Sequence, residues 1–334
     1  MSELRREPIV GRWVIVDTEH PSKPAEFEYE PSIFKEGVCP FCYGNESMTP
    51  PEIEAIRHPD TSPNSSGWQV RVVANKFPAL QIEGDLVRSG IGVYDMSTGV
   101  GAHEVVIETP YHHKDISELQ QSEIENFITM YCRRAQDLSK DKRFKYILIF
   151  KNYGAAAGAS LEHAHAQIIA LPMVPKNVQE ELKGAQGYFE FRERCIFCDI
   201  IRQEMSDNSR LVAENDGFVS FCPFVSRFPF EIWIVPKRHN SFFCKIGYSD
   251  VVSLAAILKD NIARIKKLFP NVSYNFLIHS SPINGLDSEY EWYHWHIEFI
   301  PRLTRVAGFE WGSGFYAVST PPEASAQFLR EVVL

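Results

Sequence analysis

The sequence has no run of about 20 consecutive apolar residues, the length that a helix needs to cross a bilayer. Its first eight residues are mostly polar or charged and lack the apolar core of a signal peptide. These absences argue against a membrane-spanning or secreted protein, and we expect the chain to be cytoplasmic. With 334 residues, of which 44% are hydrophobic, it is long enough for two globular domains.

Long runs of Lys and Arg are also absent. The 34 Lys and Arg residues are outnumbered by 43 Asp and Glu residues, which gives a formal net charge of −9. A broad surface for nucleic acid or anionic lipid needs clustered basic side chains. We therefore expect no nucleic-acid partner and no membrane partner.

Cysteines are few and odd in number, which argues against a disulfide framework. Of the seven, three stand alone and four form two C-x-x-C pairs, Cys39 with Cys42 and Cys195 with Cys198. In a reducing compartment, this usage favours metal ligation or free thiols.

The stretch from Asn152 to Gln167 is the most informative part of the chain. It begins with a loop of small residues that includes Gly154, Gly158 and Ser160. In such a loop, bare backbone N–H groups can approach an anion closely. We therefore predict a phosphate-sized cradle here.

The end of this stretch, His163-Ala-His165-Ala-Gln167, is typical of a β-strand. Side chains alternate along a strand, so His163, His165 and Gln167 are expected to share one face. Two imidazoles and a carboxamide beside an anion cradle indicate a catalytic site. The alternative is a polar strand face whose histidines are hydrogen-bonded within the structure.

The first half of the chain alternates strands with one amphipathic helix. The helix is predicted from Ser122-Glu-Ile-Glu125, which has the form of a capping box, and from apolar residues at helical spacing up to Leu138. Alternating or buried apolar runs predict strands at residues 9–16, 68–75, 103–108 and 145–150.

The second half repeats this order. A second C-x-x-C pair precedes a strand that ends at His239, and an amphipathic helix over residues 251–269 precedes a strand at 273–278. A second H-x-H pair, His294 and His296, closes the unit. We infer a duplicated α+β module, with residues 1–180 as the catalytic copy, 190–334 as the second copy, and a mostly helical linker at 175–192.

Each copy contains four soft or borderline metal ligands at matched positions. Four protein ligands complete a tetrahedral coordination sphere, so we predict two structural zinc ions. The predicted ligands are Cys39, Cys42, His112 and His163 in the first copy, and Cys195, Cys198, His239 and His294 in the second. His113 is an alternative to His112, and His279 is an alternative to His239.

The second histidine of each H-x-H pair is left outside the metal set. In the first copy this is His165, a neutral imidazole that can act as a nucleophile toward phosphorus. The next residue on the same strand face is Gln167 in the first copy but Glu298 in the second. A carboxylate repels phosphate, so we expect only the first copy to be catalytic, with His165 and Gln167 as the catalytic residues.

The H-x-H-x-Q pattern resembles that of the galactose-1-phosphate uridylyltransferase family, in the histidine-triad superfamily. The resemblance extends to Trp13-Val-Ile-Val, the first cysteine pair, and the segment from Val70 to Leu80. It implies two histidine-triad-like α+β modules, antiparallel sheets with packed helices, and a homodimer.

The resemblance also implies a ping-pong reaction. His165 would attack UDP-glucose, hold UMP covalently, and pass it to a hexose 1-phosphate such as galactose 1-phosphate. By matching position, Gln167 and Ser160 would contact the phosphoryl group. Asn152 and Gly158 would line the nucleotide site, and Asn75 would lie near the nucleoside.

Two alternatives remain open. The second cysteine pair is more similar to the ADP-glucose phosphorylase branch, so an ADP-sugar or dinucleoside polyphosphate phosphorylase is one alternative. The other is a non-catalytic zinc-binding module. Iron in place of zinc, in particular at the second site, is an alternative for the metal.

Overall fold

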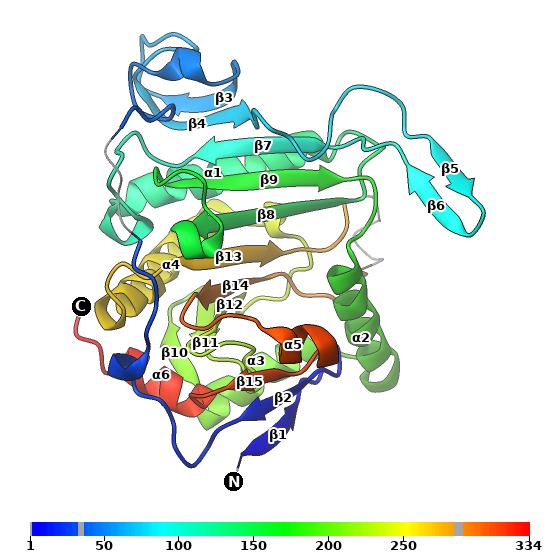
Figure 1. Ribbon diagram of the computed structural model, residues 1–334, viewed down its shortest axis with the longest axis vertical. Coiled ribbons are helices and arrows are strands. Elements are labelled where there is room, and N and C mark those ends of the chain that lie inside the picture. Colours follow the sequence, from blue (N-terminus) through cyan, green and yellow to red (C-terminus); the bar gives the residue numbers. More distant parts are fainter. Residues whose placement is uncertain (1, 33–36, 284–289) are drawn as a thin grey trace.

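The computed structural model describes residues 2–32, 37–283 and 290–334 (Figure 1). Its centre is one ten-stranded sheet in which the described strands pair antiparallel. The expected α+β class is therefore confirmed. In spatial order the strands are β10 (Leu211–Glu214), β11 (Phe218–Phe221), β12 (Ile232–Pro236), β14 (His296–Pro301), β13 (Tyr274–His279), β8 (Tyr146–Tyr153), β9 (His165–Leu171), β7 (Ala102–Ile107), β4 (Trp68–Ala74) and β3 (Glu52–Arg57).

This strand order is symmetric about the junction between β8 and β13. Outward from β8 lie β9, β7 and β4, and outward from β13 lie β14, β12 and β11. The two central strands pair directly, with Tyr153 opposite Tyr274. The duplicated unit is thus present, but its two copies share one continuous sheet instead of forming two separate ones.

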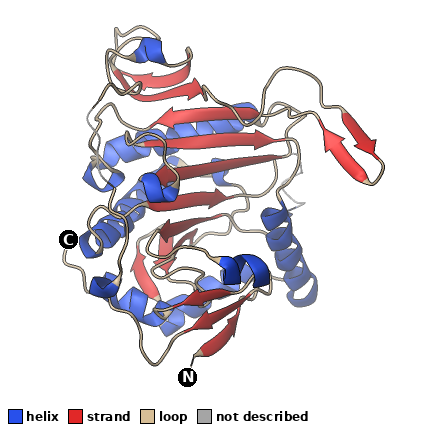
Figure 2. Ribbon diagram, in the orientation of Figure 1, coloured by secondary structure: helices blue, strands red, loops and turns tan. Residues whose placement is uncertain are grey.

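Two long helices pack on one face of this sheet and against each other (Figure 2). They are α1 (Gln121–Leu138) and α4 (Tyr248–Leu268), both close to the predicted helices. Their apolar stripes belong to the main hydrophobic core. The predicted cap of α1 was misplaced by two residues: the Gln120 N–H donates to the Glu123 carboxylate at 2.7 Å, so Gln120 and not Ser122 is the N-cap.

The amino-terminal strand lies against the carboxy-terminal part of the chain. β2 (Trp13–Val16) pairs antiparallel with β1 (Glu3–Arg6) and parallel with β15 (Tyr316–Val318). The guanidinium of Arg5 lies 3.0 Å from the Glu323 carboxylate. The strand expected at residues 9–16 is therefore shorter than predicted, and it joins the two ends of the chain.

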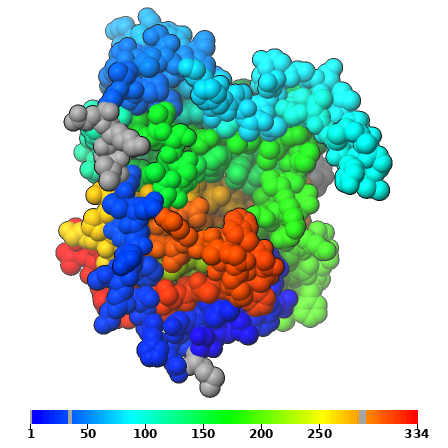
Figure 3. All heavy atoms as spheres, in the orientation of Figure 1, coloured from blue at the N-terminus to red at the C-terminus, as the bar shows by residue number. Residues whose placement is uncertain are grey.

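The remaining elements surround the sheet. A hairpin, β5 (Arg88–Ile91) with β6 (Tyr94–Ser97), projects from the body (Figures 1 and 3). None of the described helices is long and apolar enough to cross a membrane. The other helices are α2 (Lys176–Arg192), at the position of the predicted linker, α3 (Ile196–Asp207), α5 (Gly308–Ser313) and α6 (Pro322–Arg330).

Candidate active site

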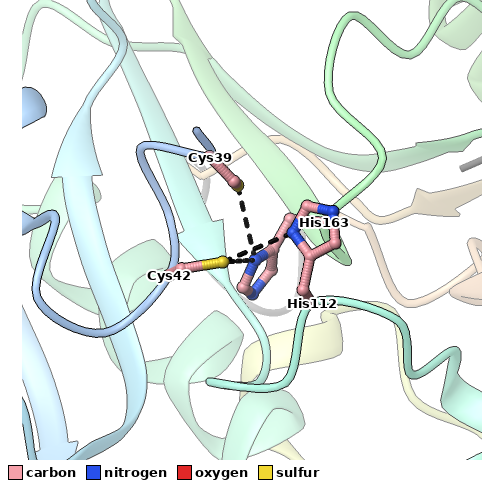
Figure 4. A group of neighbouring side chains, drawn as sticks. All are labelled: Cys39, Cys42, His112 and His163. Atoms are coloured by element: carbon pink, nitrogen blue, oxygen red, sulfur yellow. Dashed lines mark hydrogen bonds between the residues drawn. The ribbon is translucent and has the colours of Figure 1, made fainter. Parts of the chain in front are cut away.

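The first predicted metal set comes together in space. Cys39 and Cys42 lie on the loop before β3, while His112 follows β7 and His163 precedes β9 (Figure 4). The Cys42 sulfur lies 3.4 Å from His112 Nδ1 and 3.6 Å from His163 Nδ1, and the Cys39 sulfur lies 3.6 Å from the same His163 nitrogen. A tetrahedral zinc with ordinary bond lengths separates sulfur and nitrogen ligands by about 3.6 Å. The donor set therefore fits zinc.

Hydrogen bonds orient these ligands. His163 Nε2 donates to the Thr109 carbonyl at 2.7 Å, so its Nδ1 lone pair faces the sulfurs. Burial lowers the pKa of His163 to about 4, which keeps the ring in the neutral form that binds metal. Of the two adjacent histidines after β7, His112 belongs to the cluster and His113 does not.

The second predicted set has the same arrangement. Cys195 is the residue just before α3, and Cys198 lies in the first turn of this helix. The Cys198 sulfur lies 3.4 Å from His239 Nδ1 and 3.6 Å from His294 Nδ1. His294 Nε2 lies 3.0 Å from the Pro236 carbonyl, as His163 Nε2 lies near that of Thr109.

His279, the alternative ligand of the second set, belongs to a different cluster. Its Nδ1 lies 2.9 Å from the Glu181 carboxylate and its Nε2 lies 3.5 Å from Glu298. The Glu298 carboxylate also accepts from Arg227 Nη2 at 2.5 Å. Burial alone would lower the pKa of His279, but Glu181 and Glu298 outweigh it and raise this pKa to about 9. These ligand atoms, together with His296, lie close enough to hold an ion, but the carboxylates are already paired with cations.

His165 opens onto a cavity of about 620 Å³. Its Nδ1 lies 2.7 Å from the backbone carbonyl of His163, which can only accept, so Nδ1 carries the proton. Nε2 then keeps its lone pair. Burial, opposed by this hydrogen bond, lowers the pKa of His165 to about 4, so the imidazole is neutral at pH 7. This is the form required of a nucleophile.

A buried ion pair supports the strand beneath His165. The Lys151 ammonium donates to the Glu108 carboxylate and, at 3.2 Å, to the backbone carbonyl of His165. Tyr131 donates to the other oxygen of Glu108. Lys151 and Glu108 are fully buried, so this network ties the backbone of His165 to α1 and β8.

Three of the four predicted substrate-binding residues line the cavity with His165 and Gln167. They are Asn75, Gly158 and Ser160. The apolar part of the wall includes Phe41, Met48, Val73, Phe77 and Leu161. The cavity thus combines apolar walls with a few polar side chains, including the His165 imidazole, which is the pattern of a small-molecule site.

Asn152, the fourth, is not among the residues that line this cavity. Its side-chain oxygen accepts from the Asn275 amide at 2.7 Å, across the junction between β8 and β13. Asn275 also donates to the Ala157 carbonyl at 2.9 Å. Asn152 therefore helps to hold the small-residue loop, and direct contact with a nucleotide stays a prediction.

The small-residue loop differs in part from the predicted cradle. The N–H groups of Ala157, Gly158 and Ala159 donate to carbonyls of the loop itself, so they are not bare. Gly154 has φ +80°, and a Cβ there would lie 2.2 Å from the Ser273 hydroxyl, so glycine is required. The loop is a compact turn that presents Ser160 to the cavity.

One functional candidate was missed from the sequence. His103, on β7, lines the cavity and its Nε2 lies 2.8 Å from the Gln167 side-chain oxygen. Val105 is directly opposite Gln167 in the β7–β9 register, so His103, two residues away, lies on the same face. The pairing of these two strands is the signal that would have identified it.

Comparisons with known proteins agree with this geometry. Residues 1–175 match the family model for the N-terminal domain of galactose-1-phosphate uridyl transferase, and residues 181–311 match that for the C-terminal domain. An ADP-glucose phosphorylase from Arabidopsis thaliana is 36% identical over 99% of this chain and 93% of its own. A galactose-1-phosphate uridylyltransferase from Thermotoga maritima is 30% identical over 99% of this chain and 98% of its own.

The solved structures give the same result. The crystal structure of an Arabidopsis thaliana ADP-glucose phosphorylase with bound ADP-glucose has a TM-score of 0.83 and 34% identity, and the match covers 100% of both chains. A non-catalytic zinc-binding module is therefore not supported. The chain belongs to the galactose-1-phosphate uridylyltransferase family and is a nucleotidyltransferase.

Proposed function

We propose that this chain transfers a nucleotidyl group from a nucleoside diphosphate sugar to a phosphate acceptor through a covalent intermediate on His165. The observation that carries the proposal is the hydrogen bond from His165 Nδ1 to the His163 carbonyl, which leaves the Nε2 lone pair for attack in the cavity. Nε2 attacks the α-phosphorus and forms a P–N bond. The P–O bond to the sugar phosphate breaks, and the sugar phosphate leaves with the electron pair.

In the second half-reaction, a phosphate oxygen of the acceptor attacks the same phosphorus and the P–N bond breaks. His165 regains its lone pair and neutral form. Gln167 would donate a hydrogen bond to a non-bridging oxygen as negative charge develops there, and Ser160 also lines the cavity.

The two Cys₂His₂ sets are proposed to hold one zinc ion each, with iron as an alternative at the second site. With four protein ligands, such an ion has no open coordination position and would act structurally. In the first set, Cys39, Cys42 and His112 would fix His163, whose backbone carbonyl orients His165.

For the substrate, an ADP-sugar with inorganic phosphate as acceptor is the first candidate. Similarity to ADP-glucose phosphorylase, at 36% identity over nearly the whole of both chains, supports it. The second candidate is UDP-glucose with a hexose 1-phosphate, which the uridylyltransferase at 30% identity supports. A dinucleoside polyphosphate is the remaining alternative.

The test is a short incubation of the purified chain with ADP-glucose or UDP-glucose, without acceptor, followed by intact-mass measurement. We expect an adduct with the mass of an AMP residue from ADP-glucose and little adduct from UDP-glucose. A UMP adduct alone would favour the second candidate. The absence of any adduct with either donor would contradict transfer through His165.

The sequence makes further predictions that we carry forward as proposals. We propose two modules, residues 1–180 and 190–334, a homodimer and a cytoplasmic location. The shared sheet and the pairing of β2 with β15 mean that the modules would depend on each other for folding. Light scattering of the purified protein would test the homodimer.

A further inference from the structure

The imidazole of His103 has a defined tautomer. Its Nδ1 lies 3.2 Å from the backbone N–H of Ala79, which can only donate. Nδ1 must therefore be the unprotonated nitrogen, and Nε2 carries the proton of the neutral ring. This assignment depends on a backbone group, whose direction cannot be reversed by rotating a side chain.

The Nε2 proton determines how Gln167 is oriented. Nε2 lies 2.8 Å from the Gln167 side-chain oxygen, which accepts the hydrogen bond. Once the oxygen is held in this way, the NH₂ group of Gln167 is the part left for the cavity. An NH₂ group is what a negatively charged phosphoryl oxygen requires, whereas the carboxamide oxygen would repel it.

Asn75 touches the same nitrogen but does not compete for its proton. Asn75 Nδ2 lies 3.0 Å from His103 Nε2, but with Nε2 protonated both nitrogens are donors, so this contact is not a hydrogen bond. The Asn75 oxygen accepts from the N–H of Phe77 at 2.9 Å. Asn75 thus also presents its NH₂ group on this side. The acceptor for the His103 proton is therefore Gln167.

We propose that His103 is a positioning residue, which holds the Gln167 carboxamide with its NH₂ group directed at the phosphoryl group that is transferred. This inference rests on the proposed function, since it assigns His103 a role in the same reaction. Without His103, the carboxamide of Gln167 can rotate and present its oxygen to the phosphate. His103 would then influence the rate through Gln167, without touching the substrate's reacting atoms.

The second half of the chain shows the corresponding position without this device. In the β12–β14 pairing Trp233 is opposite Glu298, as Val105 is opposite Gln167, so Glu231, two residues before Trp233, takes the position of His103. Glu231 and Glu298 are both carboxylates, and both accept from the Arg227 guanidinium. The imidazole thus occurs in the half that has a carboxamide to orient.

The test is a mutant cycle read by the single-turnover rate of nucleotidyl-histidine formation and by substrate affinity. His103→Phe should slow formation of the nucleotidyl-histidine by about 10- to 100-fold, which is part of the 10²–10³-fold rate effect that one such donor contributes. Substrate affinity should change by less than about threefold. In the double variant with Gln167→Ala, His103→Phe should add no further loss. His103→Gln, which places an amide N–H near the Nε2 position, should recover most of the rate.

A second readout does not depend on activity. Nitrogen NMR of ¹⁵N-histidine-labelled protein should show the Nε2–H tautomer for the signal that His103→Phe removes.

The control for the rate measurements is His58→Phe, at an exposed loop position, which should keep the wild-type rate of nucleotidyl-histidine formation.

Three results would overturn the inference: a wild-type rate for His103→Phe, losses that add in the double variant, or the Nδ1–H tautomer. These differ from a failure of the proposed function, in which the wild-type chain would form no adduct at all.

Discussion

The two halves of the sheet have the same scaffold but different side chains at the same positions. In each half, the first histidine of the H-x-H pair clusters with two cysteines. Nδ1 of the second histidine lies near the backbone carbonyl of the first histidine, at 2.7 Å for His165 and 3.1 Å for His296. The halves differ at the next position on the strand face. Gln167 there is neutral and hydrogen-bonded to His103, whereas Glu298 is charged and paired with Arg227.

This difference extends to the space in front of each imidazole. The cavity at His165 measures about 620 Å³, but that at His296 measures about 30 Å³, too small for more than a water or two. His296 is stacked between Trp233 and His279, with ring centroids 5.0 and 4.9 Å away. Burial would raise the pKa of Glu298, but Arg227 and His279 outweigh it and lower this pKa to about 2, so an anion faces the small cavity.

From this comparison we infer that an H-x-H pair alone is not sufficient for a catalytic site. The same backbone arrangement is accompanied by a neutral amide and an open cavity in the first half, where we propose the reaction centre. It supports a packed, charge-paired core where a carboxylate and aromatic rings follow it. A cluster of two cysteines and two histidines is the feature that both halves share.

The largest effect is expected from loss of a metal ligand, which should be severe in both halves. Cys39→Ser should remove one equivalent of zinc and Cys195→Ser the other, because structural zinc of this type contributes on the order of 10 kcal/mol to folding. Metal analysis and thermal unfolding measure both effects. Cys222→Ser, at a buried cysteine outside both clusters, is the control and should keep two equivalents. Less than one equivalent in carefully purified wild-type protein would contradict the metal assignment.

The next effect should separate the halves. Gln167→Ala should slow nucleotidyl transfer by about 10²–10³, or roughly 2.7–4 kcal/mol, because it removes a donor to the developing charge. Gln167→Glu should cost at least as much, since it recreates the carboxylate of the second half beside the phosphate. Single-turnover rates measure both.

The control for this comparison is Glu298→Gln, which should leave the rate of transfer unchanged although it weakens the pair with Arg227. A rate for Gln167→Glu within about threefold of wild type would remove Gln167 from the mechanism, since a donor of this kind contributes far more.

The smallest effect concerns the charged network of the second half and its dependence on pH. The pKa of His279, raised to about 9 by Glu181 and Glu298 against burial, lies above the 6.5 of a free histidine. From this difference in pKa, protonated His279 contributes roughly 3 kcal/mol to the free energy of unfolding. This contribution is fully present below about pH 6.5 and is lost as pH rises through about 9. His279→Gln should lower the free energy of unfolding strongly at pH 6 and little at pH 10.

Urea unfolding across this pH range, with the exposed His58→Gln as the control, measures that effect. A difference between wild type and His279→Gln that stays constant from pH 6 to pH 10 would mean that His279 is neutral in the folded protein.

The sequence predicted much of the site because its signals are local. The spacing of the cysteine pairs and histidines predicted eight residues that the structure brings into two clusters. The choice between His112 and His113 could not be made from spacing, because both follow β7 and only the direction of the chain beyond the strand separates them.

What the sequence did not predict depends on contacts between distant segments. The role of His103 requires the register of β7 on β9, and the engagement of Asn152 by Asn275 requires the pairing of β8 with β13. That same pairing merges two expected sheets into one. The sequence left His279 as an alternative metal ligand. It could not show that the partner of His279 is Glu181, because Glu181 lies on α2 and comes close only in the folded chain.

The most direct test of catalysis by the first half alone is to locate the covalent nucleotide. The wild-type chain is incubated with ADP-glucose or UDP-glucose, digested, and its peptides are sequenced by mass spectrometry, in parallel with His165→Gly and His296→Ala. We expect one nucleotide per chain on His165, none in His165→Gly, and a retained adduct in His296→Ala. A nucleotide on His296, or equal loss of the adduct in two folded variants, would contradict the claim that only the first half is catalytic.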